Sequence, residues 1–173
     1  MIDTANLKTI DIDLANLIKA SEIRSTMKEN DIRIYCYAFV YKNTIMKFGE
    51  SHTWKPSTYG ERIYRQAWHI PGWPTIAQSR SGDDMLDIIK NFHGIHKSDC
   101  WIRIWDMTNY PVTVSIDPSY DVKDLERQLI KEYCEQNNGE RPVGNIKSEE
   151  HMDAPIVKDE IFDTLFAWAP VPQ

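Results

Sequence analysis

The sequence predicts an α+β fold, with a small, mainly antiparallel central sheet flanked by helices. Residues 33–41 (RIYCYAFVY) are aromatic and apolar on both faces, which is typical of a buried strand. A turn at residues 42–43 leads into residues 44–49 (TIMKFG), which return as a second strand. Residues 121–136 place apolar side chains at helical spacing and predict a long helix. A hairpin and a helix of this kind are the basis of the predicted fold class.

The remaining elements are predicted from shorter patterns. An amphipathic pattern within residues 1–30 predicts a helical N-terminal extension, and residues 60–70 predict a helix that ends before a Pro-Gly pair. Residues 100–107 alternate as a further strand. Weaker patterns predict a helix at 85–92, a strand at 112–116 and a last helix at 157–168 within an acidic C-terminal segment, 148–173. We expect one domain over residues 1–173, with its core at about 33–146.

Composition and charge restrict the class of protein. No apolar run approaches the roughly 18 residues of a membrane span, so we expect no membrane partner. The N-terminus lacks the pattern of a secretory signal, and three widely spaced cysteines form no CxxC pair. These features favour a reducing cytoplasm. The net charge of −6 argues against a protein that coats nucleic acid non-specifically. Residues 31–99 nevertheless hold nine Lys and Arg against seven Asp and Glu, so a nucleic-acid face is expected there.

Glu126 occupies an unusual position on the helix predicted at 121–136. The apolar arc of this helix comprises Val122, Leu125, Leu129, Ile130 and Tyr133. Glu126 falls in the middle of that arc. Burying a lone carboxylate is costly, so Glu126 is expected to be paired or bound to a metal ion. The alternative is that its side chain reaches solvent or forms a structural ion pair with an arginine.

The helix predicted at 60–70 carries polar side chains on one narrow face. These are Arg62, Arg65, Gln66 and His69. Guanidinium groups can contact phosphate oxygens in a bidentate manner, so this face suits a phosphate. An ordinary solvated basic face is the alternative. On the first strand, Tyr35 and Tyr37 lie on one side, where core packing is the common role of tyrosine.

Taken in order along the chain, these pieces resemble the GIY-YIG nuclease superfamily. The matching segments are residues 34–37 (IYCY), 47–49 (KFG), 62–65 (RIYR), 126–133 (ERQLIKEY) and 142–145 (PVGN). The chain departs from the family pattern in having no Gly before Ile34 and in having Lys47 where many members have Tyr. The stretch between Gly49 and Arg62 is also longer than usual. The choice between Arg62 and Arg65 as the main catalytic arginine therefore stays open.

The resemblance implies a role for each matching residue. Tyr37 or Tyr35 would accept a proton from the attacking water, and Glu126 would bind a single Mg²⁺ or Mn²⁺. Lys47 would assist the tyrosine. Arg62, alone or with Arg65, would steady the phosphate, and Gln66 would contact the substrate. His69 would assist proton transfer or hold a phosphate oxygen, and Asn145 would orient neighbouring groups. The implied function is hydrolysis of DNA phosphodiester bonds by a metal-dependent endonuclease. A ribonuclease, or a non-catalytic DNA- or protein-binding module on the same fold, is the alternative, and the oligomeric state is left open.

The nuclease interpretation requires a particular hairpin register. With a two-residue loop at 42–43, Ala38 would face Lys47, and Tyr37 and Lys47 would point to opposite sides of the sheet. A three-residue loop, or a β-bulge with the same effect, would pair Phe39 with Lys47. Lys47 would then lie diagonal to Tyr37 on one face, where its ammonium group would favour the tyrosinate.

Overall fold

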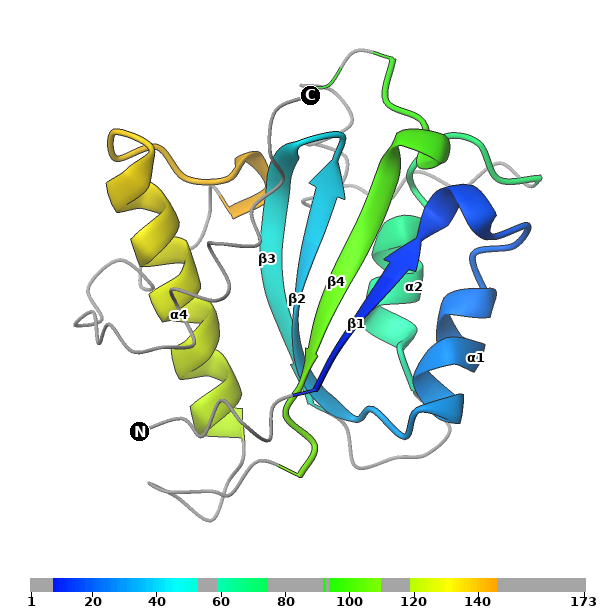
Figure 1. The fold of residues 1–173 in the computed structure, drawn as a ribbon, viewed down its shortest axis with the longest axis horizontal. Helices are drawn as coiled ribbons and strands as arrows, with labels where there is room; N and C mark the ends of the chain where they lie inside the picture. The colour runs from blue at the N-terminus through cyan, green and yellow to red at the C-terminus, as the bar shows by residue number, and fades with distance from the viewer. Residues whose placement is uncertain (1–7, 53–58, 75–91, 93, 110–118, 146–173) are drawn as a thin grey trace.

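A four-stranded antiparallel sheet lies between two layers of helix in the computed structural model, which describes residues 8–52, 59–74, 92, 94–109 and 119–145 (Figure 1). The strands are β1 (Lys8–Asp13), β2 (Ile34–Tyr41), β3 (Thr44–His52) and β4 (Cys100–Asp106). Their order is β1-β4-β2-β3, and each of the three pairings is antiparallel. The α+β class and the antiparallel sheet are therefore confirmed.

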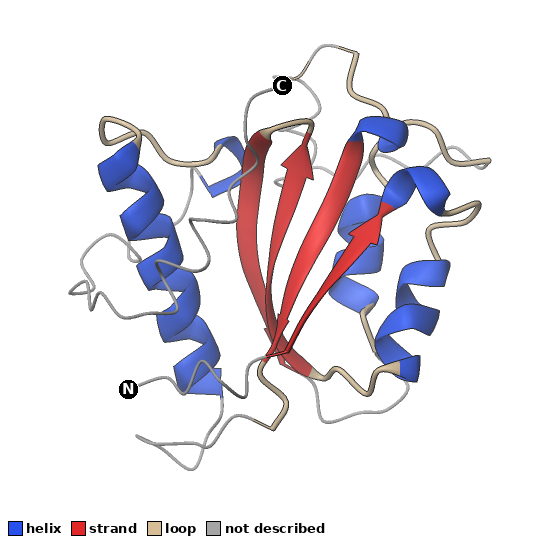
Figure 2. Ribbon diagram, in the orientation of Figure 1, coloured by secondary structure: helices blue, strands red, loops and turns tan. Residues whose placement is uncertain are grey.

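Helices cover both faces of this sheet (Figure 2). Helices α1 (Glu22–Glu29) and α2 (Glu61–Ala67) lie on one face, and α4 (Ser119–Gln136) lies on the other. Three short 3-10 turns complete the described elements: η2 (Leu14–Asn16), η4 (Lys97–Asp99) and η5 (Val143–Asn145). Turn η5 packs on β3, as α4 does, so the edge strand β3 has neighbours on two sides.

Strand β2 is the centre of two hydrophobic cores because its side chains alternate between the two faces. Tyr35, Tyr37 and Phe39 pack with residues of α1 and α2 on one face. On the other face, β2 contributes Cys36 and Ala38 to a core shared with α4. The prediction that residues 33–41 form a strand buried on both faces is confirmed.

The N-terminal segment corrects one prediction. Residues 8–13 form β1, which pairs with β4 at the edge of the sheet, so this segment is part of the sheet and not a helical extension. The reason is a period of two: Ile10 and Ile12 alternate with polar residues, and both pack against the core beneath the sheet. Among the described residues of the expected N-terminal helix, Glu22–Glu29 form the α-helix α1 and Leu14–Asn16 form the 3-10 turn η2.

Other predicted elements are present in the structure with small differences in their bounds. The strand at 100–107 and the long helix at 121–136 are confirmed as β4 and α4, the latter starting earlier at Ser119. Helix α2 ends at Ala67, before the Pro-Gly pair at 71–72. The strand expected at 112–116 and the helix at 157–168 lie outside the described residues, as does the helix at 85–92 except for its last residue.

Two further properties concern the described residues. All three cysteines are buried free thiols, with no disulfide. None of the helices in the described part of the chain has both the length and the apolar surface to cross a bilayer.

Candidate active site

The β2–β3 hairpin combines a two-residue turn with a β-bulge. Tyr41 pairs with Thr44, but the register shifts by one residue so that Phe39 pairs with Lys47 and Tyr37 with Gly49. Directly paired residues share a face of the sheet, so Lys47 lies diagonal to Tyr37 on the same face. The nuclease interpretation requires this register or a bulge with the same effect, and the hairpin contains the bulge.

The ring of Tyr37 lies directly against the backbone of Gly49. A Cβ atom at residue 49 would come within 2.2 Å of Cζ of Tyr37, so only glycine fits there. The Tyr37 hydroxyl donates a hydrogen bond of 2.8 Å to Oε1 of Gln66, and both side chains are buried. Gln66 therefore anchors α2 to the sheet through Tyr37, a contact that the helical wheel alone does not reveal.

Burial of Tyr37 overturns one sequence-based expectation. It raises the pKa of the Tyr37 hydroxyl far above its usual range, and the charge that opposes this most is the guanidinium of Arg62. The expectation that Lys47 makes Tyr37 a ready tyrosinate is therefore wrong for the free protein. Tyr37 is a neutral, hydrogen-bonded core residue at physiological pH.

Tyr35 lies two residues before Tyr37 on the same face of β2, and its hydroxyl differs in its hydrogen bonding. The side chain is 1% exposed, and in the described part of the chain its hydroxyl has no hydrogen-bond partner of good geometry. Burial raises its pKa to about 12, while Ser51 and then Arg62 act in the opposite direction and Glu50 adds to the rise. An unpartnered buried hydroxyl is uncommon because it costs about 1–3 kcal/mol.

The two arginines of α2 are in different environments. Nε of Arg65 binds Glu61 at 2.9 Å, and Arg24 from α1 binds the same carboxylate at 3.1 Å. Arg62 is exposed and makes no hydrogen bond or ion pair with a described residue. The titratable groups that raise the pKa of Arg62 are, in order of size, Tyr37, Glu50, Glu126 and Tyr35, whereas burial lowers it. Arg62 is thus the arginine that faces the tyrosines, and Arg65 stabilises the helix pair.

Glu126 lies within the apolar surface of α4, as the sequence predicts. Its side chain is 8% exposed, whereas Val122, Leu125 and Leu129 around it are fully buried. Burial, followed by the charge of Glu50, raises the pKa of Glu126 to about 7, although Arg62 and Lys47 act against that rise. The charges of Arg62 and Lys47 therefore act on Glu126, although the three residues come from different elements.

Glu50 is a member of this group that the sequence analysis did not identify. It is 9% exposed and pairs with Cys36 across the β2–β3 ladder, on the face that α4 covers. The predicted strand ended at Gly49, so Glu50 lay outside every predicted element. Extending the period of two from Phe48 would have placed Glu50 on the inner face, because β3 continues to His52.

Asn145 fixes the position of the edge strand. Its Nδ2 donates to the carbonyl oxygen of Phe48, and its Oδ1 accepts from the Phe48 amide, both at 2.9 Å. Asn145 is 3% exposed. Since Phe48 lies between Lys47 and Gly49, this pair of hydrogen bonds orients the strand that carries them.

His69 is placed differently from the other predicted site residues. It follows the end of α2, is half-buried, and has its ring 6.3 Å from that of Trp68. It is not among the residues whose charges shift the pKa of Arg62 or Glu126. Hydrogen bonds and charge interactions thus connect a group that excludes His69 and comprises Tyr35, Tyr37, Lys47, Glu50, Arg62, Gln66 and Glu126. Asn145 binds Phe48, between Lys47 and Gly49.

The donor set was tested against the expected cation. Among the described residues, no three His, Cys, Asp or Glu side chains form a metal-binding group. Mg²⁺ needs no such group, because it is commonly held by one or two carboxylates with water and substrate phosphate completing six oxygens. Two nearby buried carboxylates, Glu50 and Glu126, fit this requirement.

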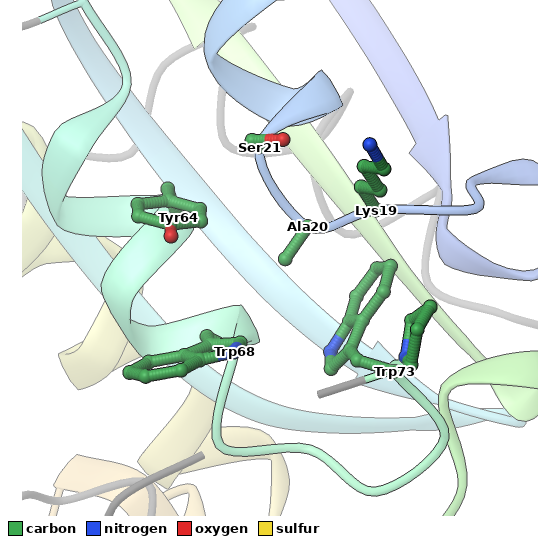
Figure 3. A pocket seen from close by; sticks show the side chains of 7 residues that line it. Lys19, Ala20, Ser21, Tyr64, Trp68 and Trp73 are labelled. Carbon is green, nitrogen blue, oxygen red and sulfur yellow. The ribbon is translucent and has the colours of Figure 1, made fainter. Parts of the chain in front are cut away.

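A separate pocket of about 290 Å³ lies between α2 and the segment that precedes α1 (Figure 3). Three of its lining residues are aromatic, and the lining comprises Lys19, Ala20, Ser21, Tyr64, Trp68, Trp73 and Pro74. The Trp73 indole donates to the carbonyl oxygen of Ala67 at 2.9 Å, which fixes one wall. None of its lining residues belongs to the group around Arg62.

No protein-family model, curated protein or solved structure matches this chain.

Proposed function

We propose that this chain is a divalent-metal-dependent endonuclease of the GIY-YIG type that hydrolyses DNA phosphodiester bonds. The observation that carries the proposal is the environment of Arg62. This guanidinium makes no ion pair with a described residue, yet it lies close to two buried tyrosines and two buried carboxylates. An anionic substrate group would complete such a site, and a phosphate matches the geometry of guanidinium.

The basic side chains hold the scissile phosphate in this proposal. Arg62 contacts the non-bridging oxygens and stabilises the negative charge that develops on them in the transition state. Lys47 adds a second positive charge from the bulged strand, where its side chain is 5% exposed. We do not assign this role to Arg65, because Glu61 is its ion-pair partner in the structure.

The buried hydroxyl of Tyr35 acts on the attacking water. It is unpartnered and lies beside Arg62, so it can hydrogen-bond a water molecule or a phosphate oxygen without breaking an existing contact. Tyr37 has a structural role in this proposal, because its hydroxyl is already hydrogen-bonded to Gln66. A divalent cation at Glu126 would neutralise phosphate charge and lower the pKa of bound water.

Two alternatives use the same surface. A ribonuclease would present the same groups to an RNA phosphate, and a binding module would hold the phosphate without hydrolysis. Both are distinguished from the proposed function by product analysis on DNA and RNA substrates, because the binding module releases no product.

The test is nicking of supercoiled plasmid DNA in Mg²⁺ or Mn²⁺, with and without EDTA. We expect cleavage with metal and none with EDTA. Arg62→Ala should reduce the single-turnover rate by about 100-fold or more, because it removes a charge that acts on the transition state.

Arg65→Ala is the matched control on the same helix. It leaves Glu61 paired with Arg24, so the rate should stay within a few-fold of the wild-type rate. Cleavage that survives EDTA, or equal losses in both arginine variants, would contradict the proposal.

A further inference from the structure

The carboxylates of Glu50 and Glu126 both lie near the thiol of Cys36. Glu50 pairs with Cys36 on β2, so both face the side covered by α4. The Cys36 thiol donates to the carbonyl oxygen of Val122 at 3.3 Å, and Glu126 follows Val122 by one helical turn. The charges of both Glu126 and Glu50 act on the Cys36 thiol. The thiol therefore lies between a carboxylate from the strand and one from the helix.

This arrangement brings two carboxylates together in a largely buried position, where Arg62 and Lys47 act against their repulsion. Glu50 and Glu126 are 9% and 8% exposed, and two buried like charges at close range repel. Oε2 of Glu50 contacts Nδ1 of His52 at 3.1 Å, and its Oε1 makes no hydrogen bond with a described residue. One oxygen of Glu50 is thus oriented by His52 and the other is available to a ligand.

The unpartnered hydroxyl of Tyr35 is an independent sign of an absent ligand. It is buried without a hydrogen bond of good geometry to a described residue, although Ser51 is near enough to lower its pKa, and the charges that act on it are those of Arg62 and Glu50. A cation-bound water or a phosphate oxygen at this position would give the hydroxyl the partner that the described residues do not supply.

We propose that Glu50 is a second ligand of the Mg²⁺ or Mn²⁺ that Glu126 binds, with His52 orienting the Glu50 carboxylate. The inference rests on the proposed nuclease function and extends it by one ligand and one positioning residue. A hard cation of this size is suited to two carboxylates, with water and a phosphate oxygen as its other ligands. A hydrogen bond to a ligating carboxylate is the usual outer-shell support of such a site.

The test measures Mn²⁺ binding to the purified protein without DNA, by electron paramagnetic resonance of free Mn²⁺. Glu50→Gln and Glu126→Gln should each weaken the affinity by about tenfold or more. Glu135→Gln is the matched control, because Glu135 lies on the exposed side of α4. It should bind Mn²⁺ as the wild type does.

Thermal unfolding separates loss of the site from loss of the fold. Without metal, both Gln variants should melt at or above the wild-type temperature, because each removes one of two repelling carboxylates. Mn²⁺ should raise the midpoint of the wild type and of Glu135→Gln, with a much smaller rise for the two site variants.

Two results would overturn the inference. Wild-type affinity in Glu50→Gln together with weak binding in Glu126→Gln would leave Glu126 as the sole carboxylate ligand, and the proposed nuclease would stand. Failure of the wild-type protein to bind Mn²⁺ would remove the two-carboxylate site altogether. Plasmid nicking in Mn²⁺ would then decide separately whether the proposed function also fails.

Discussion

Tyr35 and Tyr37 have the same side chain on the same face of β2, yet they are in different states. Their ring centroids lie 6.0 Å apart, but only the Tyr37 hydroxyl has a hydrogen-bond partner, Gln66. This difference predicts opposite effects on stability and activity when each hydroxyl is removed.

Tyr35→Phe should leave the free energy of unfolding unchanged or slightly higher, because the lost hydroxyl makes no hydrogen bond in the described structure. Its nicking rate should fall strongly. Tyr37→Phe should lower the free energy of unfolding by about 1–3 kcal/mol, because Gln66 is left buried without its partner. Urea unfolding and single-turnover nicking measure the two effects. An active Tyr35→Phe beside an inactive but stable Tyr37→Phe would reverse the two roles.

At the scale of single residues, the sequence could predict those whose position follows from one helix or strand. Glu126 stands out on its helical wheel without reference to any other element. The different environments of Arg62 and Arg65 could not be predicted. Arg65 belongs to an ion-pair group around Glu61 that includes Arg24, and Arg24 is 37 residues away from Glu61 in sequence. The same holds for the two tyrosine hydroxyls, since the partner of Tyr37 comes from α2.

The edge strand β3 is the element on which the candidate site depends most. It carries the bulge, the glycine under Tyr37 and the inward-facing Glu50, and Asn145 holds its outer edge through Phe48. An edge strand has one row of backbone groups that the sheet leaves unpaired. The side chain of Asn145 occupies part of that row.

Asn145→Ala should therefore loosen the strand as well as lower stability. Loss of two buried hydrogen bonds predicts a decrease of about 1–3 kcal/mol in the free energy of unfolding. Hydrogen exchange of the Phe48 amide should accelerate, because Asn145 is its acceptor. Asn137→Ala is the control, since the Asn137 side chain donates to the Tyr133 carbonyl at the exposed end of α4. Unchanged hydrogen exchange of the Phe48 amide in Asn145→Ala would contradict the conclusion that the Asn145 side chain holds strand β3 in place.

The elements themselves show where sequence patterns were informative. Strand β2 was predicted because its residues are aromatic and apolar on both faces, and helix α4 because its apolar residues recur at helical spacing. Strand β1 was missed because its alternation of Ile10 and Ile12 lies next to an amphipathic stretch that favours helix, and only pairing with β4 decides between them. The nuclease interpretation requires a bulge such as the one at Met46. The sequence could not predict that the bulge forms, because its formation depends on the pairing of the whole hairpin.

At the scale of the whole molecule, opposite layers supply opposite charges to one edge of the sheet. Helix α2 on one side brings Arg62, and α4 on the other brings Glu126, while β3 contributes Lys47 and Glu50 between them. The net charge of −6 says nothing of this arrangement. It follows only from the placement of helices on both faces of the sheet (Figure 1).

The buried carboxylate of Glu126 should make the stability of the whole protein depend on pH. Burial, and then Glu50, raises its pKa from 4.5 to about 7. The folded state therefore keeps a proton that the unfolded state releases above pH 4.5, and stability falls as pH rises towards and through 7. The size of this loss is on the order of a few kcal/mol, complete by about pH 8.

Urea unfolding in EDTA at pH 5 and pH 8 measures this effect against Glu126→Gln. Glutamine cannot titrate, so the variant should lose less stability over the same range and should exceed the wild type in stability at pH 8. Mn²⁺ should restore part of the wild-type stability at pH 8, because a cation bound to the carboxylate favours its ionised form. The same pH dependence in both proteins would mean that Glu126 is ionised in the folded state at neutral pH. Burial and the charge of Glu50 would then not raise the pKa of Glu126 to about 7.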